Sequence, residues 1–264
     1  MQYLSQIFAN KKTRIIAIVV ASVLLVSIIS AIVFSFYVSD YYKADYRAIG
    51  QFKEDTAVMY ETYKLNGNEK HTVYHPVYSP DNNNETRGGF IFYPGGKVEA
   101  AAYEPLMIEL ANRGVLCVLV EMPLNLSILD AGAAENIVAA IPEVDNWYIG
   151  GHSLGGTMAA AYLDSHSDEM SGLVLLGSYA TSDVSDERVI SIYGSLDGVM
   201  NRNSYESNKK NLPDNFIEIV IPGGNHSGFG MYGAQDGDNE ATLSNKEQIK
   251  LTAEYIADFV FNRI

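Results

Sequence analysis

Short apolar runs alternate with longer segments of helical periodicity through the chain after Gly89. The runs are four to six residues long and rich in branched and aromatic side chains, which is typical of buried strands. They are 89–93, 115–120, 147–150, 172–177, 189–193 and 216–221. The helical segments are 105–112, 131–141, 157–166 and 246–262. This alternation predicts an α/β fold, a mostly parallel sheet with helices on both faces.

Two earlier stretches, 56–63 and 72–78, alternate between apolar and polar residues and predict an antiparallel pair at the edge of that sheet. The sheet would then have about eight strands. Pro105 suits the first turn of its helix and Gly114 suits the carboxyl-terminal cap. On the helix 246–262, the apolar residues Ile249, Ala253, Ile256 and Val260 fall on one face.

The amino-terminal pattern is different, because Ile15 to Val38 is a 24-residue run without a charge. A helix of that length crosses a hydrocarbon core of ~30 Å, whereas a cleaved signal typically has an apolar region of ~7–15 residues and a small-residue cleavage site. We therefore predict a transmembrane helix at 15–38, after an amino-terminal segment at 1–14. A tether at 39–55 would lead to the globular domain at 56–264.

Sidedness follows from the flanking charges. Lys11, Lys12 and Arg14 precede the run with no acidic neighbour, whereas Lys43 and Arg47 follow it. This balance favours a cytoplasmic amino terminus, with the globular domain on the extracytoplasmic side of the membrane.

The net charge and the cysteine content limit which partners and which thiol chemistry can be expected. All 32 acidic residues but only 15 of the 18 Lys and Arg lie after residue 38, a net charge of −17. Such a surface repels nucleic acid and anionic headgroups, so neither is expected as a partner. The one cysteine, Cys117, lies in an apolar run, where a buried and inert thiol is expected.

The strongest chemical signal is Gly151-His152-Ser153-Leu154-Gly155, between the strand at 147–150 and an Ala-rich helix. This order is that of a nucleophile elbow, which holds a serine in a strained turn at the top of a sheet. Strand and helix backbones approach closely there, so the positions at 151 and 155 cannot carry side chains.

A serine nucleophile needs a base and an acid to orient it, and the chain offers both just after strands. Asp197 follows the strand at 189–193, and His226 follows the strand at 216–221. Loops after parallel strands emerge at one edge of the sheet, so we expect Ser153, Asp197 and His226 to converge as a catalytic triad. Asp183 and Asp186 are the alternative acids. His152 is expected to make a structural hydrogen bond.

A tetrahedral intermediate also needs backbone N–H donors. The residue after the nucleophile, Leu154, supplies one, and the loop after the strand at 89–93 should supply the other. That loop is Gly95-Gly96-Lys97, in which either Gly96 or Lys97 could be the second donor.

No metal or other cofactor is expected. His71 and His75 would stand ~13 Å apart on a strand, too far to share an ion. Asp236, Asp238, Glu240 and Glu247 match four calcium-loop positions, but Ala241 occupies the position that requires glycine.

On these motifs, residues 89–264 resemble the α/β-hydrolase superfamily, and are most similar to its compact dienelactone-hydrolase-like group. Further matching residues are Pro94-Gly95-Gly96 and Gly224-Asn225-His226, and the run 229–238 is similar to a feature of membrane-associated bacterial members. Dienelactone hydrolases proper use a cysteine where this chain has Ser153, so the resemblance implies a serine hydrolase rather than that activity.

The expected function is a membrane-anchored serine hydrolase that cleaves a carboxylic ester or related acyl bond through an acyl-enzyme. Only residues 179–188 separate two strands where larger hydrolases insert a lid, so the site should be open to a small or exposed acyl substrate. The alternatives are an acyltransferase with the same triad and a non-catalytic envelope protein on a hydrolase scaffold.

Overall fold

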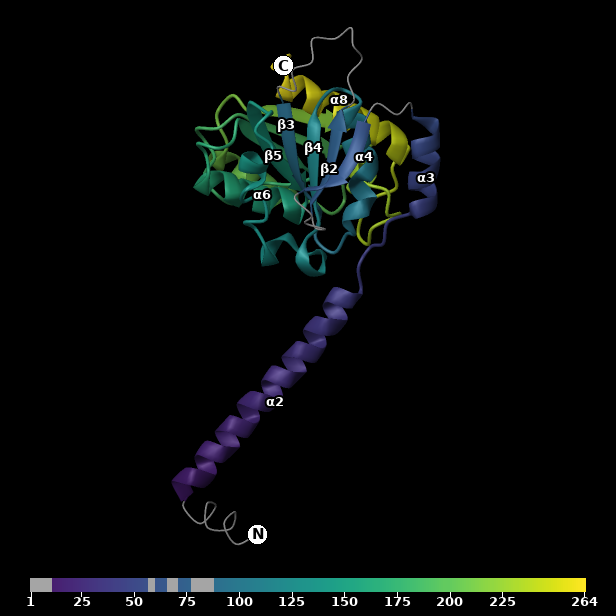
Figure 1. Ribbon diagram of the computed structural model, residues 1–264. Coiled ribbons are helices and arrows are strands. Elements are labelled where there is room, and N and C mark those ends of the chain that lie inside the picture. Colours follow the sequence, from purple (N-terminus) through teal and green to yellow (C-terminus); the bar gives the residue numbers. More distant parts are fainter. Residues whose placement is uncertain (1–10, 57–59, 66–70, 77–87) are drawn as a thin grey trace. The chain divides into compact units, whose positions relative to one another are not determined.

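The computed structural model describes residues 11–56, 60–65, 71–76 and 88–264 (Figure 1). Most of the amino-terminal segment, together with parts of both predicted edge strands, lies outside these residues. The chain divides into two units, Met1–Asp40 and Tyr41–Ile264.

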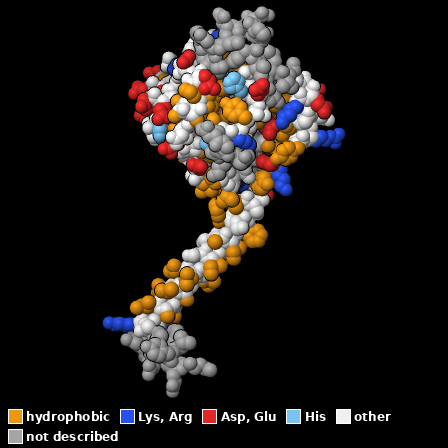
Figure 2. Space-filling view, in the orientation of Figure 1, with side chains coloured by type: hydrophobic (Ala, Val, Ile, Leu, Met, Phe, Trp, Pro, Cys, Tyr) orange, Lys and Arg blue, Asp and Glu red, His pale blue; other side chains and the backbone are white. Residues whose placement is uncertain are grey.

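The described part of the first unit forms the helix α2 (Lys11–Ser39), in which no residue is buried. Apolar side chains lie along its whole length, with a basic side chain near its amino-terminal end (Figure 2). A helix that is apolar all round is unsuited to water on every side. Its length and composition make α2 a candidate membrane span.

Among the described residues of the second unit, eight strands form one sheet in the order β1-β2-β4-β3-β5-β6-β7-β8. The strands are β1 (Tyr60–Lys64), β2 (His71–Pro76), β3 (Gly88–Tyr93), β4 (Leu116–Val120), β5 (Asn146–His152), β6 (Gly172–Leu176), β7 (Val189–Gly194) and β8 (Ile217–Ile221). β2 is antiparallel to both β1 and β4, and all other neighbours are parallel. The predicted fold class and the antiparallel edge pair are confirmed.

Helices cover both faces of the sheet (Figure 1). One face packs against α3 (Tyr46–Asp55), α4 (Glu104–Ala111) and α8 (Asn245–Val260), and the other against α5 (Ile137–Ala140) and α6 (Leu154–Ser165). α7 (Arg202–Asn208) follows β7. Short 3₁₀ turns are η2 (Ala100–Tyr103), η3 (Pro123–Asn125), η4 (Ser127–Leu129), η5 (Lys209–Asn211) and η6 (Ser227–Phe229).

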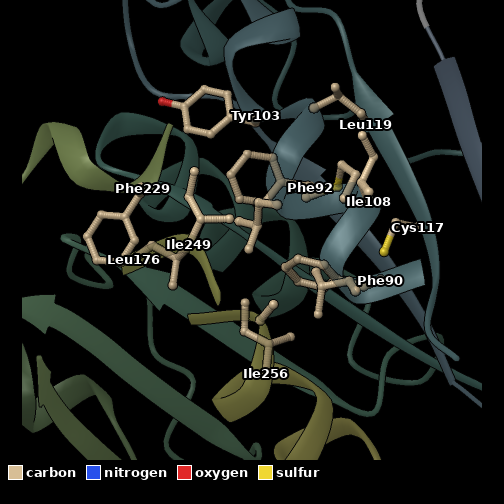
Figure 3. Packing of buried hydrophobic residues seen from close by; sticks show 14 of the residues in the cluster. Phe90, Phe92, Tyr103, Ile108, Cys117, Leu119, Leu176, Phe229, Ile249 and Ile256 are labelled. Carbon is tan, nitrogen blue, oxygen red and sulfur yellow. The ribbon is translucent and has the colours of Figure 1, made fainter. Parts of the chain in front are cut away.

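Alternate residues of each strand enter opposite cores, as the period of two requires. Phe90 and Phe92 of β3 pack with Ile249 and Ile256 of α8, whereas Ile91 and Tyr93 enter the core beneath α6. Figure 3 shows the first of these clusters. Cys117 lies in it, fully buried, and burial raises the pKa of its thiol well above the ordinary value, as expected of an inert cysteine.

Two expectations differ from the structure. The helix predicted over 131–141 is only four residues, Ile137–Ala140, because Asn136 has a left-handed backbone with φ 66°. The Tyr93 hydroxyl fixes the preceding turns, donating to the Ala131 carbonyl and accepting from the Ala134 N–H. Tertiary hydrogen bonds therefore override the helical pattern there.

The segment expected to be a tether, 39–55, instead folds largely onto the globular unit. α3 begins at an Asp45 cap that accepts the Ala48 N–H, and Ile49 and Phe52 are buried in the core against α4 and α8. A segment that contributes core side chains is part of the unit.

Candidate active site

Ser153 lies at a sharp turn between β5 and α6, with φ 52° and ψ −122°. Its N–H donates to the Leu176 carbonyl at 2.9 Å, which ties the turn to β6. A Cβ at Gly151 or Gly155 would lie 2.4 or 2.2 Å from the Tyr93 carbonyl oxygen. Only glycine fits at these two positions, which is the geometry expected of a nucleophile elbow.

The structure brings Asp197 and His226 together across 29 residues of sequence. His226 Nδ1 lies 2.9 Å from Asp197 Oδ2, and both side chains are almost fully buried. Asp197 Oδ1 accepts the N–H groups of Val199 and Met200 at 3.0 and 2.8 Å. Burial raises the pKa of Asp197, but the hydrogen bonds from His226 and these backbone groups outweigh it and leave the pKa below its ordinary value.

The other imidazole nitrogen of His226, Nε2, is buried and has no hydrogen-bond partner among the described residues. A polar atom buried without a partner costs free energy, so such atoms tend to mark function. The imidazole ring packs against Gly177, where a Cβ would lie 3.0 Å from Nδ1. Gly177 also lines the cavity that contains Ser153.

That cavity has a volume of about 310 Å³. Its walls come from the elbow, from the loop after β6 and from the loop that carries Asp197, and they contain no charged side chain. The lining residues are Ser153, Leu154, Thr157, Gly177, Ser178, Tyr179, Thr181, Val199, Met200 and Asn201. A cavity of this kind suits a small uncharged group.

The alternative acids do not reach His226. Asp183 and Asp186 line a separate hollow with Asp164 and Ser167, from the carboxyl-terminal end of α6. Hydrogen bonds from Ser185 lower the pKa of Asp183. The Asp183 carboxylate therefore stabilises the local turn at 183–185.

Gly95, Gly96 and Lys97, the three residues of the loop after β3, each make a different contact. The Gly95 N–H donates to the Tyr103 hydroxyl at 3.2 Å, and the Lys97 N–H donates to the Asn125 carbonyl at 2.7 Å. Gly96, between them, lies against the elbow, because a Cβ there would be 3.0 Å from Leu154 Cδ2.

Sequence reasoning assigned His152 only a hydrogen bond, and its Nδ1 lies 2.8 Å from the Tyr103 hydroxyl. Its ring is also 4.4 Å from that of His226, centroid to centroid, so the two imidazole rings pack together. Burial, followed by the charge of His226, lowers the pKa of His152 well below its ordinary value, and this histidine is neutral at neutral pH.

The structure gives Asp238 a role that the sequence does not predict, since the sequence indicates it only as one of four calcium-loop positions. Its carboxylate accepts the N–H groups of Gly198, His226 and Ser227, at 3.0, 3.2 and 2.8 Å. Asp238 therefore joins the loop of Asp197 to the loop of His226. No short pattern in the sequence signals this bridge, because its partners lie at 198 and at 226–227, far from each other in the sequence.

Other metal-ligand candidates have different partners. Glu247 forms a capping box with Ser244 at the start of α8, and His75 Nδ1 lies 2.9 Å from the Pro76 carbonyl oxygen. Within the described ranges, no three His, Cys, Asp or Glu side chains are grouped so that they could hold a metal ion.

Comparison with known proteins agrees with this fold. Residues 89–250 match the family described as Alpha/beta hydrolase family, so the chain belongs to that family and is a hydrolase by class. A crystal structure described as a "predicted CIB-like hydrolase" from Thermoplasma acidophilum is similar, with a TM-score of 0.50 and 12% identity over 76% of this chain and 99% of the other. At that identity the likeness concerns the fold alone. None of the curated proteins matches the chain.

Proposed function

We propose that the protein is a membrane-anchored serine hydrolase that cleaves a carboxylic ester or related acyl bond through an acyl-enzyme. The observation that carries the proposal is the buried Asp197–His226 pair, at 2.9 Å, on the same sheet edge as the strained turn at Ser153. Within the family, we assign the chain to the compact members with a serine nucleophile, since the connection after β6 is short.

In this reaction Ser153 Oγ attacks the acyl carbonyl carbon, and His226 Nε2 accepts the proton that Oγ loses. Asp197 accepts a hydrogen bond from Nδ1–H, which fixes the tautomer that leaves Nε2 free to act as the base. The protonated His226 then donates to the leaving oxygen, and the acyl group remains on Ser153. Water, activated by the same Nε2, releases the acid and restores the serine.

Two backbone donors stabilise the oxyanion in this proposal, the N–H groups of Leu154 and Gly96. Lys97 is the weaker candidate, because its N–H already donates to Asn125. The contact of Gly96 with Leu154 supports a pair of donors aimed at one site.

The cavity of about 310 Å³ beside Ser153 supports an uncharged acyl group of modest size as substrate. The apolar helix α2 supports anchoring in a membrane, and the lysines and arginine before it support a cytoplasmic amino terminus. The globular unit would then act on the extracytoplasmic side.

Labelling of the full chain with a fluorophosphonate probe tests the activated serine. We expect the parent to be labelled, Ser153→Ala and His226→Ala to lose labelling, and Ser167→Ala to retain it. Ser167 is an exposed serine just beyond the carboxyl-terminal end of α6, the opposite end of the helix from Ser153. A folded parent that resists the probe would contradict the proposal and favour a non-catalytic envelope protein. Product analysis of a labelled enzyme with added acyl acceptors separates hydrolysis from acyl transfer.

A further inference from the structure

The start of the globular unit is bound to the loop after β3. Tyr42 forms a parallel bridge with Val98: its N–H donates to the Lys97 carbonyl at 2.7 Å, and its carbonyl accepts the Glu99 N–H at 3.0 Å. The next residues continue the attachment, since the Ala44 N–H donates to the Glu99 carboxylate at 2.9 Å. Residues 42–44 are therefore fixed beside the loop that contains Gly96.

The same segment is fixed to the loop after His226. The Asp45 N–H donates to the Met231 carbonyl at 2.8 Å, and the Tyr42 hydroxyl accepts the Asp236 N–H at 3.1 Å. The rings of Tyr42 and Tyr232 lie 5.7 Å apart, centroid to centroid. The chain thus enters the globular unit between the two loops that flank the candidate site.

The apolar helix α2 ends at Ser39, three residues before Tyr42. Three extended residues span at most about 11 Å. If α2 crosses a membrane, this connection keeps the entry of the globular unit, and with it the edge that carries the site, close to the bilayer surface.

An exposed apolar turn lies on this same edge. Leu124, Ile128 and Leu129 are 51%, 60% and 49% exposed, in the connection after β4. They are three of the seven large apolar side chains that are strongly exposed in the described part of residues 41–264. Such a concentration in six residues of one connection is a patch that water does not favour.

The apolar turn at 124–129 contacts two parts of the candidate site, the loop after β3 and the helix α6. The Asn125 carbonyl accepts the Lys97 N–H, and η4 packs against α6, the helix that Ser153 begins. Since β3, β4 and β5 are parallel, the loops that follow them all emerge at the edge of the sheet that carries Ser153.

We propose that this edge faces the bilayer, and that Leu124, Ile128 and Leu129 insert into the boundary between headgroups and acyl chains. Single apolar side chains on a rigid turn, next to a covalent anchor, can enter that boundary to a shallow depth. The occupant is a zwitterionic lipid surface, because the globular unit is strongly acidic and repels anionic headgroups. The inference rests on the proposed anchoring by α2, and it makes lipid-dissolved acyl compounds the substrates nearest to Ser153.

Depth-dependent fluorescence quenching tests the contact. The full chain is reconstituted into phosphatidylcholine vesicles, with one environment-sensitive fluorophore on Ile128→Cys, or on Leu129→Cys as a second position. Val26→Cys, in the middle of α2, and Asp168→Cys, in the loop before β6 at the opposite edge of the sheet, are the controls. The unsubstituted chain shows whether the buried Cys117 takes any label.

We expect a nitroxide placed high on the lipid acyl chain to quench the labels at Ile128 and Leu129, and a nitroxide near the middle of the chain to quench the label at Val26. The losses of emission should be comparable, and the label at Asp168 should lose none. The same pattern is expected in a chain that also carries Ser153→Ala, because the contact does not require catalysis.

Quenching at Val26 without quenching at Ile128 and Leu129 would overturn the inference and leave the anchoring intact. Quenching at Asp168 as strong as at Ile128 would overturn it as well, because adsorption would then have no preferred face. No quenching at Val26 would overturn both the anchoring and the inference.

Discussion

Gly177 shows how one residue can control the geometry of this site. It directly follows β6 and has φ 50°, a backbone conformation that residues with side chains rarely adopt, and a Cβ there would lie 3.0 Å from His226 Nδ1 and 3.1 Å from Asp197 Oδ2. We predict that Gly177→Ala displaces the Asp197–His226 pair. Because displacements of ~1 Å cost up to about 10²-fold in rate, kcat for ester hydrolysis should fall at least tenfold.

Gly132→Ala is the matched control, because a Cβ at Gly132 meets nothing within 4 Å. Its kcat should equal that of the parent. If Gly177→Ala also retained the parent's kcat, with both variants folded by circular dichroism, the pair would not be the catalytic acid and base.

His152 should make stability depend on pH. Burial and the neighbouring His226 lower its pKa below the ordinary 6.5, so below that pH the unfolded chain binds a proton that the folded chain does not. The free energy of unfolding should therefore fall as the pH decreases from 6.5 towards the lowered pKa, by up to about 1.4 kcal/mol per pH unit.

The variant His152→Asn should remove this contribution while its amide can still reach the Tyr103 hydroxyl. Urea unfolding at a series of pH values from 7.5 downwards measures the difference. Equal slopes for variant and parent would show that His152 does not carry the effect.

The sequence could predict the three residues proposed as the triad because each lies in the connection that follows a parallel strand, and the topology brings such connections to one edge of the sheet. Gly177, Tyr103 and Asp238 could not be predicted in this way. Their roles depend on contacts between loops that are far apart in sequence, which no local pattern specifies. The choice between Gly96 and Lys97 likewise required the partner of the Lys97 N–H, the Asn125 carbonyl.

At the scale of elements, α3 is the clearest addition to the sequence prediction. Phe52 is 2% exposed and packs in the core. We predict that Phe52→Ala lowers the free energy of unfolding by about 3–5 kcal/mol, as expected for removal of a buried aromatic side chain. Gly50→Ala should instead raise it by about 0.5–1 kcal/mol, because a Cβ at this helical position meets nothing within 4 Å.

Chemical denaturation of the full chain, monitored by far-ultraviolet circular dichroism, measures both effects. A true tether would make Phe52→Ala neutral, so a change smaller than that of Gly50→Ala would contradict the placement of α3 in the unit.

We expect the loop after His226 to stabilise the site through the hydrogen bonds of Asp238. Its carboxylate accepts four backbone N–H groups, those of Gly198, His226, Ser227 and Asn239, and hydrogen bonds to charged groups contribute about 1.5–3 kcal/mol each. Asp238→Ala should lower the free energy of unfolding by at least about 1.5 kcal/mol. It should also reduce kcat, because both Asp197 and His226 sit in the loops that it joins.

Asp236→Ala is the control, since Asp236 is exposed and contributes only its backbone N–H to Tyr42. It should leave stability and kcat unchanged. An Asp238→Ala protein as stable and as active as Asp236→Ala would contradict the bridging role.

The elements themselves were largely predictable, because buried parallel strands are continuous apolar runs and α8 has a regular apolar face. The failures at 131–141 and 39–55 have one physical cause. In each, a contact with a distant part of the chain decides the conformation: the Tyr93 hydroxyl in the first segment, and the core against α4 and α8 in the second.

At the scale of the whole molecule, the acidic surface favours contact with water, whereas the proposed membrane contact favours the bilayer. Acidic side chains are spread over the visible face of the globular unit (Figure 2), and a charged surface of this kind favours solubility. The apolar turn with Leu124, Ile128 and Leu129 differs from this acidic surface, and the chain enters the unit at the same edge of the sheet. Anchoring alone would leave the unit free to rotate, whereas anchor and turn together would give it one orientation.

That orientation leads to a prediction about substrate presentation. For the full chain in phosphatidylcholine vesicles, the double variant Ile128→Ser with Leu129→Ser should hydrolyse an ester dissolved in the same bilayer about tenfold more slowly than the parent. Burying each aliphatic side chain is worth roughly 1.5–3 kcal/mol, so losing both removes most of the bias towards the productive orientation. A short water-soluble ester should be hydrolysed at the parent's rate, because it reaches Ser153 from solution.

Val220→Ser, which removes an apolar side chain that is 44% exposed on β8, should change neither rate. Equal losses on the two esters would mean that the turn acts on the site itself, and no loss on either would mean that the bilayer does not orient the unit through this turn.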